Sequence, residues 1–424
     1  MRKIISIINF FSTYNRKRLL ENFIFLSLLQ MVYYIIPLIT FPYLIKVLGT
    51  EKFGLISFSQ AFIYYFVILT DYGFNLSATR SISVNRNNQQ KISEIFNGVM
   101  FLKLIFLIIT FILMTIIVFS FKKFYENWLL YLLTYGLVIG QSLFPIWLFQ
   151  GMEKMKYITL INVLAKVIFT IAIFIFVKNS ADYILVPFFN SLGFILAGII
   201  SLIIAIKNFH IKFYLPNYST LKYYFKDGWI FFKTTVFLSA YRESNIFILG
   251  LITNNTITSY YAIAEKTIKI IQSIQTPLGQ ALYPHVCNKY ASDSNNFTQY
   301  HFKYQKIIYL FYLVIAIVTF LFSNYIIKII TGLTINEAII NLKILSFVLI
   351  IGGLNYYHGI LGLIPLKLEN LFSTFVTITG LINIILCIIL SYIYKDIGAS
   401  LSLLISETLL LFLILNKLYN LSKK

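Results

Sequence analysis

Long uninterrupted apolar runs constrain this chain more than any other feature of its sequence. The stretch from Leu104 to Phe119 reads LIFLIITFILMTIIVF and carries no charge. Blocks of about 20 residues are what a helix needs to cross the roughly 30 Å core of a bilayer. In lipid only helices and closed barrels leave no backbone polar group unpaired. Barrel strands alternate apolar with polar residues, which these runs do not, so we predict membrane-spanning helices.

Blocks of this kind recur along the whole chain. Only 12% of the 424 residues are charged, whereas soluble domains carry about 25%, so a water-soluble fold is excluded. The sequence therefore predicts an all-α membrane protein with about twelve transmembrane helices. The blocks lie at 23–45, 55–70, 97–121, 128–149, 158–177 and 183–206, and then at 229–252, 258–282, 305–330, 338–363, 370–391 and 396–417.

The basic residues predict the orientation. An even number of spans places both termini on one side of the membrane. When a residue within three positions of a block end is counted with the adjoining loop, 21 of the 35 Lys and Arg residues fall in the termini and in the loops on that side, seven in the opposite loops and seven deeper within the blocks. Because cytoplasmic loops carry the excess of Lys and Arg, both termini are predicted to be cytoplasmic. The start, MRKIISIINFF, lacks a small-residue cleavage site, so we expect an interfacial helix rather than a cleaved signal.

The two halves of the chain show a weak internal repeat. Tyr43–Phe62 is similar to Phe247–Lys266, and the turn that begins at Gly151 is similar to the one at Leu363. Repeats of this kind are typical of alternating-access transporters. We therefore expect two six-helix halves around a central cavity. The expected parts are an N-terminal interfacial segment 1–22, a first half 23–206, a cytoplasmic linker 207–227, a second half 228–417 and a tail 418–424.

Several function classes find no support in the sequence. The net charge of +20 is dispersed among the loops, which indicates topology and headgroup contact rather than a nucleic-acid partner. Cys287 and Cys387 form no metal-binding pattern, and we expect neither a metal nor a cofactor. No Walker-type loop is present, so ATP hydrolysis is not expected. No loop is long enough to fold as a domain, and we do not expect an enzyme.

One stretch resembles a known family. Tyr43–Phe106 contains Tyr-Leu, a basic residue, Val-Leu-Gly, Phe-Gly, then Thr-Asp-Tyr-Gly-Phe-Asn, Ala-Thr-Arg and a lysine in the third helix. This pattern resembles the N-terminal signature of the polysaccharide transporter family, and the region from Tyr260 resembles its second half. The matching positions are Gly49, Gly54, Asp71, Tyr72, Gly73, Phe74, Arg80 and Lys103.

The resemblance implies an O-antigen flippase of the multidrug/oligosaccharidyl-lipid/polysaccharide exporter superfamily. Such a protein resides in the bacterial inner membrane and serves lipopolysaccharide biosynthesis. The implied substrate is an undecaprenyl-pyrophosphate-linked oligosaccharide repeat unit of O-antigen or capsule, moved from the cytoplasmic to the periplasmic leaflet. The implied partners are membrane lipids, a polysaccharide polymerase and a chain-length regulator.

Charged groups inside spans cost about 2.5–3.5 kcal/mol each on insertion scales, which makes them functional candidates. A pyrophosphate needs cations, and Arg binds it bidentately. Arg242 and Lys269 lie about 15 Å from the outer ends of their spans, near the midplane. The alternative is that they only neutralise Glu243 and Glu265, the latter one i,i+4 step from Lys269. The predicted cationic residues are Arg242, Lys269, Lys266, Lys103 and Lys166, the last two alternatively snorkelling to headgroups.

A second set of residues is predicted to couple transport to an ion gradient or to gate the pathway. Buried acids near cations exchange protons, so Glu265 and Glu243 are candidates. Asp71 and Arg80 flank the signature at the cytoplasmic end of the second span, where they gate the inward opening, sense protonation or form an intracellular ion pair. His358 is a candidate to titrate in a proton-coupled cycle, and the alternative is a contact with sugar or water.

Three rival functions remain open at this stage. A multidrug or cation antiporter of the same superfamily would carry cavity acids, whereas the charges predicted inside spans here are mostly basic. A peptidoglycan lipid-precursor flippase shares the undecaprenyl-pyrophosphate group, but the Asp-Tyr-Gly-Phe-Asn stretch favours the O-antigen or capsule branch. A membrane-bound polymerase or acyltransferase would need a large outer loop or a cluster of acids and histidines.

Overall fold

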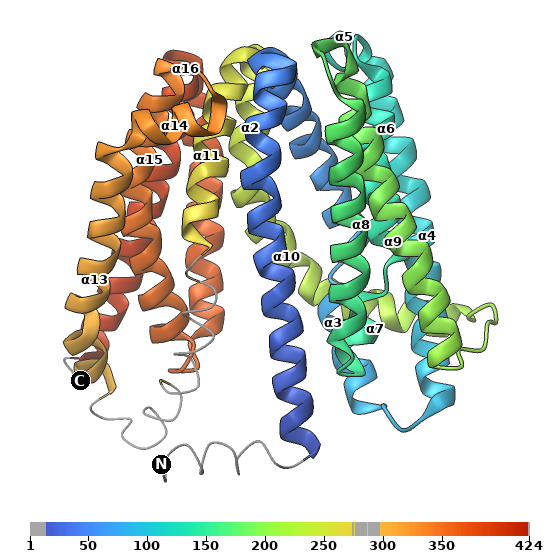
Figure 1. The fold of residues 1–424 in the computed structure, drawn as a ribbon. Coiled ribbons are helices and arrows are strands. Elements are labelled where there is room, and N and C mark those ends of the chain that lie inside the picture. Colours follow the sequence, from blue (N-terminus) through green and yellow to red (C-terminus); the bar gives the residue numbers. More distant parts are fainter. Residues whose placement is uncertain (1–13, 274, 276–285, 287–296, 423–424) are drawn as a thin grey trace, which may run out of the picture. The chain divides into compact units, whose positions relative to one another are not determined.

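The computed structural model describes residues 14–273, 275, 286 and 297–422, and every regular element in these ranges is a helix (Figure 1). The all-α prediction is therefore confirmed. Within these ranges eight helices are long and apolar enough to cross a membrane. The number of twelve spans stays a prediction. The expected interfacial helix lies mostly before Tyr14, outside the described residues.

The N-terminal part of the chain forms helices of very different length. They are α2 (Tyr14–Asp71), α3 (Phe74–Val84), α4 (Gln89–Ser120), α5 (Lys122–Tyr125), α6 (Trp128–Leu143), α7 (Ile146–Gly151), α8 (Met155–Phe176), the short 3₁₀ helix η1 (Ser180–Ile184) and α9 (Leu185–Asn208).

The C-terminal part continues in the same way and contains one π-helical segment. Its elements are α10 (Tyr218–Ile252), α11 (Asn255–Gln272), α13 (Phe297–Leu321), α14 (Ser323–Thr331), α15 (Asn336–Asn355), the π-helix η2 (Tyr356–Leu363) and α16 (Glu369–Ser422).

The two longest helices are each broken once. The backbone of α2 leaves the helical region at Gly49, with φ 77° and ψ 168°, a conformation that glycine adopts without a steric penalty. The backbone of α16 breaks at Lys395, with φ 55° and ψ −127°. Each break separates two apolar blocks that the sequence predicts as distinct spans.

Polar side chains define where helices begin. Asn88 precedes α4, and its side-chain oxygen accepts a hydrogen bond from the backbone N–H of Lys91 at 3.0 Å. Asn254 precedes α11 and accepts from the N–H of Ile257 at 2.9 Å. Such caps satisfy backbone donors that the first turn of a helix leaves open.

The chain folds into two compact units. The first unit contains Met1–Pro37 and Phe62–Val236, and the second contains Leu38–Ala61 and Phe237–Lys424. Helices α2 and α10 therefore each contribute to both units. The segment 38–61 belongs by its contacts to the second unit, although the sequence analysis assigned it to the first half; the predicted domain boundaries stay predictions.

Each unit contains one long helix that is more buried than the others. In the first unit α6 packs along α9 and also contacts α4, and in the second α15 packs against α11, α13 and α16. In the most apolar stretches of α6–α7 and of α15–η2, 56% of the residues are buried, against 18–33% in α4, α8, α9, α13 and α16. The latter helices therefore leave most of their apolar side chains facing outward, as helices surrounded by lipid do.

Candidate functional site

The first unit contains a buried ion pair that joins two predicted residues. The ammonium nitrogen of Lys103, on α4, lies 3.1 Å from Oδ1 of Asp71, the last residue of α2. The Lys103 side chain is 3% exposed and that of Asp71 is 20% exposed. Because an unpaired ammonium is very unfavourable in this environment, Asp71 is what makes the burial of Lys103 tolerable.

The signature Asp-Tyr-Gly-Phe-Asn forms a sharp turn next to this pair. Tyr72 and Gly73 both have left-handed backbones, with φ 47° and 74°. A Cβ atom on Gly73 would lie 2.7 Å from the backbone nitrogen of Phe232 on α10, so only glycine fits. The Tyr72 ring stacks on Phe106 and Phe232, each with ring centroids 4.7 Å away. The signature therefore fixes α10 against the end of α2.

Arg80 does not pair with Asp71 but with a residue from another helix. Its guanidinium on α3 lies 2.5 Å from Oδ1 of Asp227 on α10 and 5.4 Å from the ring centroid of Phe231. The Arg80 side chain is 56% exposed, and exposed pairs contribute only about 0–1 kcal/mol. This contact again joins α3 to the first half of α10.

Lys166 meets an aromatic ring instead of an acid. Its ammonium nitrogen, on α8, lies 3.9 Å from the centroid of the Tyr33 ring on α2. The hydroxyl of Thr159 donates to the carbonyl of Phe25 at 2.7 Å and joins the same two helices. A cation over an aromatic face is stabilised by about 0.5–2 kcal/mol, so Lys166 is held at a helix contact.

The second unit repeats the pairing of a predicted lysine with a predicted acid. The ammonium of Lys269 lies 3.4 Å from Oε1 of Glu265, one turn earlier on α11, which confirms the predicted i,i+4 step. The Glu265 side chain is 5% exposed and that of Lys269 is 42% exposed. The hydroxyl of Tyr261 also donates to Glu265 at 3.5 Å.

Lys266 points to different neighbours from those of Lys269. Its ammonium donates to the hydroxyl of Ser57 at 2.9 Å and lies 4.9 and 4.8 Å from the ring centroids of Phe41 and Phe53. Arg242 and Glu243 lie on α10, but their side chains are outside the described part of the structure. The prediction that Arg242 and Lys269 share one cavity therefore stays a prediction.

The second unit also contains a buried neutral network that was not predicted from the sequence. Asn245 donates to the hydroxyl of Tyr261 and to the carbonyl of Ala399, both at 3.1 Å, and accepts from Asn383 at 2.7 Å. Ser406 donates to Asn383 at 3.3 Å. A search restricted to charged residues overlooks it, whereas asparagines within apolar blocks are the signal that would have found it.

Two further acids were missed as well. Asp396, 7% exposed at the break in α16, accepts from Asn341 at 2.6 Å. Glu407, inside the last predicted block, is half-buried and accepts from Asn355 at 2.6 Å. The second unit therefore holds more acids within its apolar blocks than Glu243 and Glu265, so a scarcity of such acids does not distinguish this chain from an antiporter.

His358 is fully buried in η2, and the structure gives it a partner that the sequence analysis did not name. Its Nδ1 lies 3.1 Å from Nε2 of His301 on α13. His301 is 3% exposed and His358 is 0% exposed. Two imidazoles 57 positions apart in sequence thus form one buried hydrogen-bonded pair.

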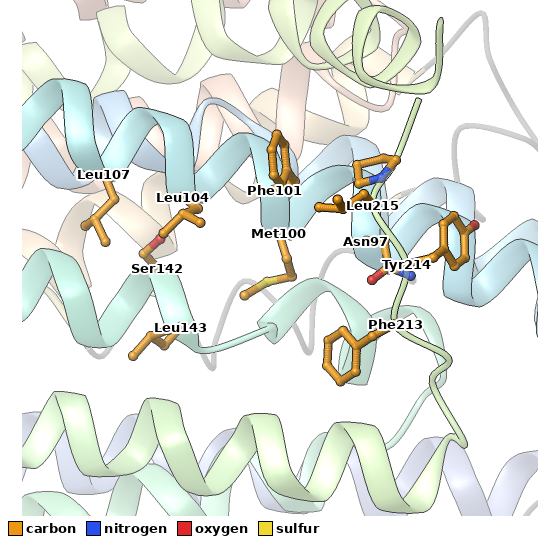
Figure 2. A pocket seen from close by; sticks show the side chains of 11 residues that line it. Asn97, Met100, Phe101, Leu104, Leu107, Ser142, Leu143, Phe213, Tyr214 and Leu215 are labelled. Atoms are coloured by element: carbon orange, nitrogen blue, oxygen red, sulfur yellow. The ribbon is translucent and has the colours of Figure 1, made fainter. Parts of the chain in front are cut away.

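A cavity of about 470 Å³ lies in the first unit, and none of the predicted site residues lines it. Figure 2 shows that its side chains come from α4, from the end of α6 and from the segment 213–216. Burial and the nearby Glu94 carboxylate raise the pKa of the Tyr214 phenol at its rim, an effect that Lys91 partly offsets. The lining is apolar apart from Asn97, Ser142 and Tyr214, so it suits a hydrocarbon rather than a pyrophosphate.

Comparison with solved structures defines the fold. The structure titled "Lipid II flippase MurJ, inward closed conformation" matches with a TM-score of 0.75 at 16% identity, over 95% of this chain and 90% of that one. An inward-facing multidrug resistance MATE family transporter of the MOP superfamily matches with a TM-score of 0.63 at 13% identity, over 95% and 99%. The chain therefore has the transporter fold that MurJ and MATE proteins share.

Sequence comparison then defines the family. The family model described as "Polysaccharide biosynthesis protein" matches residues 19–289. The "Putative O-antigen transporter" of Escherichia coli (strain K12) is 30% identical over 401 residues, 95% of this chain and 97% of that protein. A protein of the same name from Shigella dysenteriae is 28% identical over 272 residues, 63% and 67% of the two chains. The chain belongs to this polysaccharide biosynthesis protein family, which confirms the resemblance seen in the sequence.

Proposed function

We propose that this chain is a flippase that moves undecaprenyl-pyrophosphate-linked oligosaccharide repeat units from the cytoplasmic to the periplasmic leaflet of a bacterial inner membrane by alternating access. The observation that carries the proposal is the match to the Escherichia coli protein named "Putative O-antigen transporter" over 95% of this chain. We place both termini in the cytoplasm, as the distribution of Lys and Arg predicts.

The ion pairs support an exchange of the substrate anion for a proton. In each unit a predicted substrate lysine is held by a predicted coupling acid, Lys103 by Asp71 and Lys269 by Glu265. While the acid is ionised, it competes with a pyrophosphate for the lysine. When the acid binds a proton, the lysine is released to bind the anionic headgroup. Binding of proton and substrate would then be linked through a shared lysine.

The candidate lysines differ in how readily they reach a substrate. Lys269 is 42% exposed, so it is the first candidate for binding the substrate, together with Arg242. Lys266 donates to Ser57 between two phenylalanine rings, and Lys166 contacts Tyr33, so both would have to leave these contacts. Lys103 is buried with Asp71 and requires the acid to be protonated first.

The other coupling candidates receive different roles in this proposal. Arg80 is paired with Asp227 across α3 and α10, and we assign it to gating at the cytoplasmic end. Glu243 is adjacent to Arg242 on α10, and we assign to it the same competition for a cation that Glu265 provides for Lys269.

Complementation of a strain that lacks its own O-antigen flippase tests the proposal. The wild-type chain should restore the ladder of surface glycan on a gel. Lys269→Ala and Arg242→Ala should reduce it without loss of protein from the membrane, and Arg242→Lys should restore it in part. Lys343→Ala is the matched control, because Lys343 is an exposed lysine on α15 to which no role is assigned. Full export by both alanine variants at native expression would remove the cationic site from the mechanism.

A peptidoglycan lipid-precursor flippase is the second candidate, because the MurJ fold matches with a TM-score of 0.75. The two functions differ in the sugar and not in the undecaprenyl pyrophosphate. A strain depleted of its lipid II flippase separates them. Restored growth of that strain, without restored O-antigen in the first strain, would favour the second candidate.

A further inference from the structure

The histidine pair of the second unit has a nitrogen whose hydrogen-bonding capacity is not used. His358 Nδ1 and His301 Nε2 share a hydrogen bond of 3.1 Å. The remaining ring nitrogen of His358, Nε2, is buried and has no hydrogen-bond partner among the described residues. Buried polar atoms in native structures nearly always have a partner, and an exception calls for an explanation.

The arrangement limits the protonation states that the pair can adopt. A neutral imidazole carries one N–H and one bare nitrogen. If His301 donates to His358, then His358 carries a buried N–H at Nε2 with no acceptor. If His358 donates to His301, then Nε2 of His358 is a bare basic nitrogen. Adding a proton to that nitrogen gives an imidazolium whose Nδ1–H still donates to the neutral ring of His301.

Aromatic rings lie against both imidazoles, and their faces offset part of the cost of burying a positive charge there. The ring of Tyr357 lies parallel to that of His301, with centroids 4.2 Å apart and an interplanar angle of 9°. The Tyr357 hydroxyl donates to the backbone carbonyl of His301 at 2.8 Å, which fixes this stack. The electron-rich face of a phenol attracts a cation. Phe302 adds a second ring, 6.0 Å from His358.

The charged groups around the pair include the carboxylate of Glu407, which contacts the residue directly before η2. Glu407 accepts a hydrogen bond from Asn355, which immediately precedes η2 and lies about one turn from His358. Other titratable side chains described on the elements packed around the pair are Lys303, Lys306, Tyr309 and Tyr312 on α13, Glu337 and Lys343 on α15, Tyr356 and Tyr357 on η2, Lys367 in the turn after it, and Glu369, Cys387, Tyr392, Tyr394, Lys395, Asp396, Lys417 and Tyr419 on α16.

The backbone around His358 is suited to respond to a change in charge. Residues 356–363 are π-helical, a geometry that is rare and often found at functional sites. His301 lies in the second turn of α13, and η2 ends five residues after His358. Under the predicted topology both positions adjoin cytoplasmic loops, so the proton would come from the cytoplasmic side.

We propose that His301 and His358 form a proton-binding site in which the added proton resides on Nε2 of His358 and the charge is shared through the hydrogen bond to His301. No other reactant takes part: one N–H bond forms on binding and breaks on release. Occupancy of this site changes during transport, a role that rests on the proposed function, whereas the site itself does not.

Nitrogen NMR of the full-length protein in lipid nanodiscs tests the site directly. The chain has four histidines, so uniform ¹⁵N-histidine labelling gives few signals. His210, on the surface, is assigned by His210→Gln, which also serves as the control. We expect a scalar coupling across the hydrogen bond between His301 Nε2 and His358 Nδ1. We also expect Nε2 of His358 to gain a proton as the pH falls from 8 to 4.

Two variants of His301 sharpen this test. His301→Phe keeps the ring stacked on Tyr357 but removes the acceptor, so the affinity of His358 for its proton should fall at least about tenfold, the size of a hydrogen bond to a charged group. His301→Gln keeps an acceptor and should lose less. A wild-type spectrum without the coupling, or an Nε2 of His358 that never titrates in this range, would overturn the proposal even if both variants failed to fold.

Transport tests the role. Proteoliposomes receive an undecaprenyl-pyrophosphate oligosaccharide with a fluorescent sugar, and the pH is stepped on one side. The wild-type rate should depend on pH, and His301→Phe should lose at least about half of that response while His210→Gln keeps it. Absence of wild-type translocation would refute the proposed function and leave the NMR result to decide the site. If the transport rate of His301→Phe depended on pH as strongly as that of the wild type, the site would not be coupled to transport.

Discussion

Neutralising Asp71 should destabilise the first unit more than removing its partner Lys103. Removing one partner from a buried ion pair costs about 3–5 kcal/mol, because the other charge stays buried. The Asp71→Asn variant leaves the ammonium of a side chain that is 3% exposed, so we expect a loss of about 3 kcal/mol or more. Lys103→Met leaves a carboxylate that is 20% exposed, and partial hydration should limit the loss to about 1–2 kcal/mol.

The double variant Asp71→Asn, Lys103→Met should be close to wild type, since neither charge remains to be buried. For a domain of this size each kcal/mol shifts the melting temperature by about 2–4 °C. Thermal unfolding of purified protein, followed by size-exclusion chromatography after heating, should therefore show a loss on the order of 10 °C for Asp71→Asn and about half of that for Lys103→Met. Losses that add in the double variant would refute the pairing. A stable double variant that exports no glycan would support the substrate role of Lys103.

Three further predictions concern other parts of the chain. Tyr72→Phe should be as stable as wild type, since the buried Tyr72 hydroxyl has no hydrogen-bond partner in the part of the chain that the structure describes, whereas Tyr72→Ala should lose about 3–5 kcal/mol with the ring stack; the melting temperatures of the two variants test this difference. Gly73→Ala should lower the amount of folded protein in the membrane, because its Cβ would meet the backbone of Phe232 at 2.7 Å. The control is Gly332→Ala, since Gly332 has a similar φ but open space around it. Immunoblots of membranes from the two variants separate the effect of the steric clash from that of backbone strain. Reporter fusions after Tyr125 and Asn255 should read periplasmic and one after Asn217 cytoplasmic; a periplasmic signal at Asn217 would overturn the predicted topology.

The helical architecture follows from the sequence because it depends on local composition. In lipid, runs such as Leu104–Phe119 satisfy the hydrogen bonds of their backbone only as helices. The Asp-Tyr-Gly-Phe-Asn signature was sufficient to predict the family. The spacing of Glu265 and Lys269 on one helix also sufficed to predict their contact. In each of these cases the residues that determine the feature lie within about 20 positions of one another.

Contacts between segments that are distant in sequence could not be predicted from the sequence alone. Asp71 and Arg80 are near neighbours in sequence, yet the structure pairs Asp71 with Lys103 and Arg80 with Asp227. The His301–His358 pair joins positions 57 apart, and only tertiary packing decides such partners. The neutral network around Asn245 was missed for another reason, since asparagine in a span costs less than a charge and was not searched for.

The central claim is that this chain translocates a lipid-linked oligosaccharide across a membrane. The most direct measurement is the sidedness of an undecaprenyl-pyrophosphate oligosaccharide in proteoliposomes, read as the fraction that a glycan-specific lectin reaches from outside over time. The account predicts that purified wild-type protein accelerates the exchange between leaflets, that Lys269→Ala and Arg242→Ala slow it, and that Lys343→Ala does not. The claim would be contradicted if the lipid exchanged between the leaflets no faster than in protein-free vesicles. The lipid used must be one that a known O-antigen flippase moves under the same conditions.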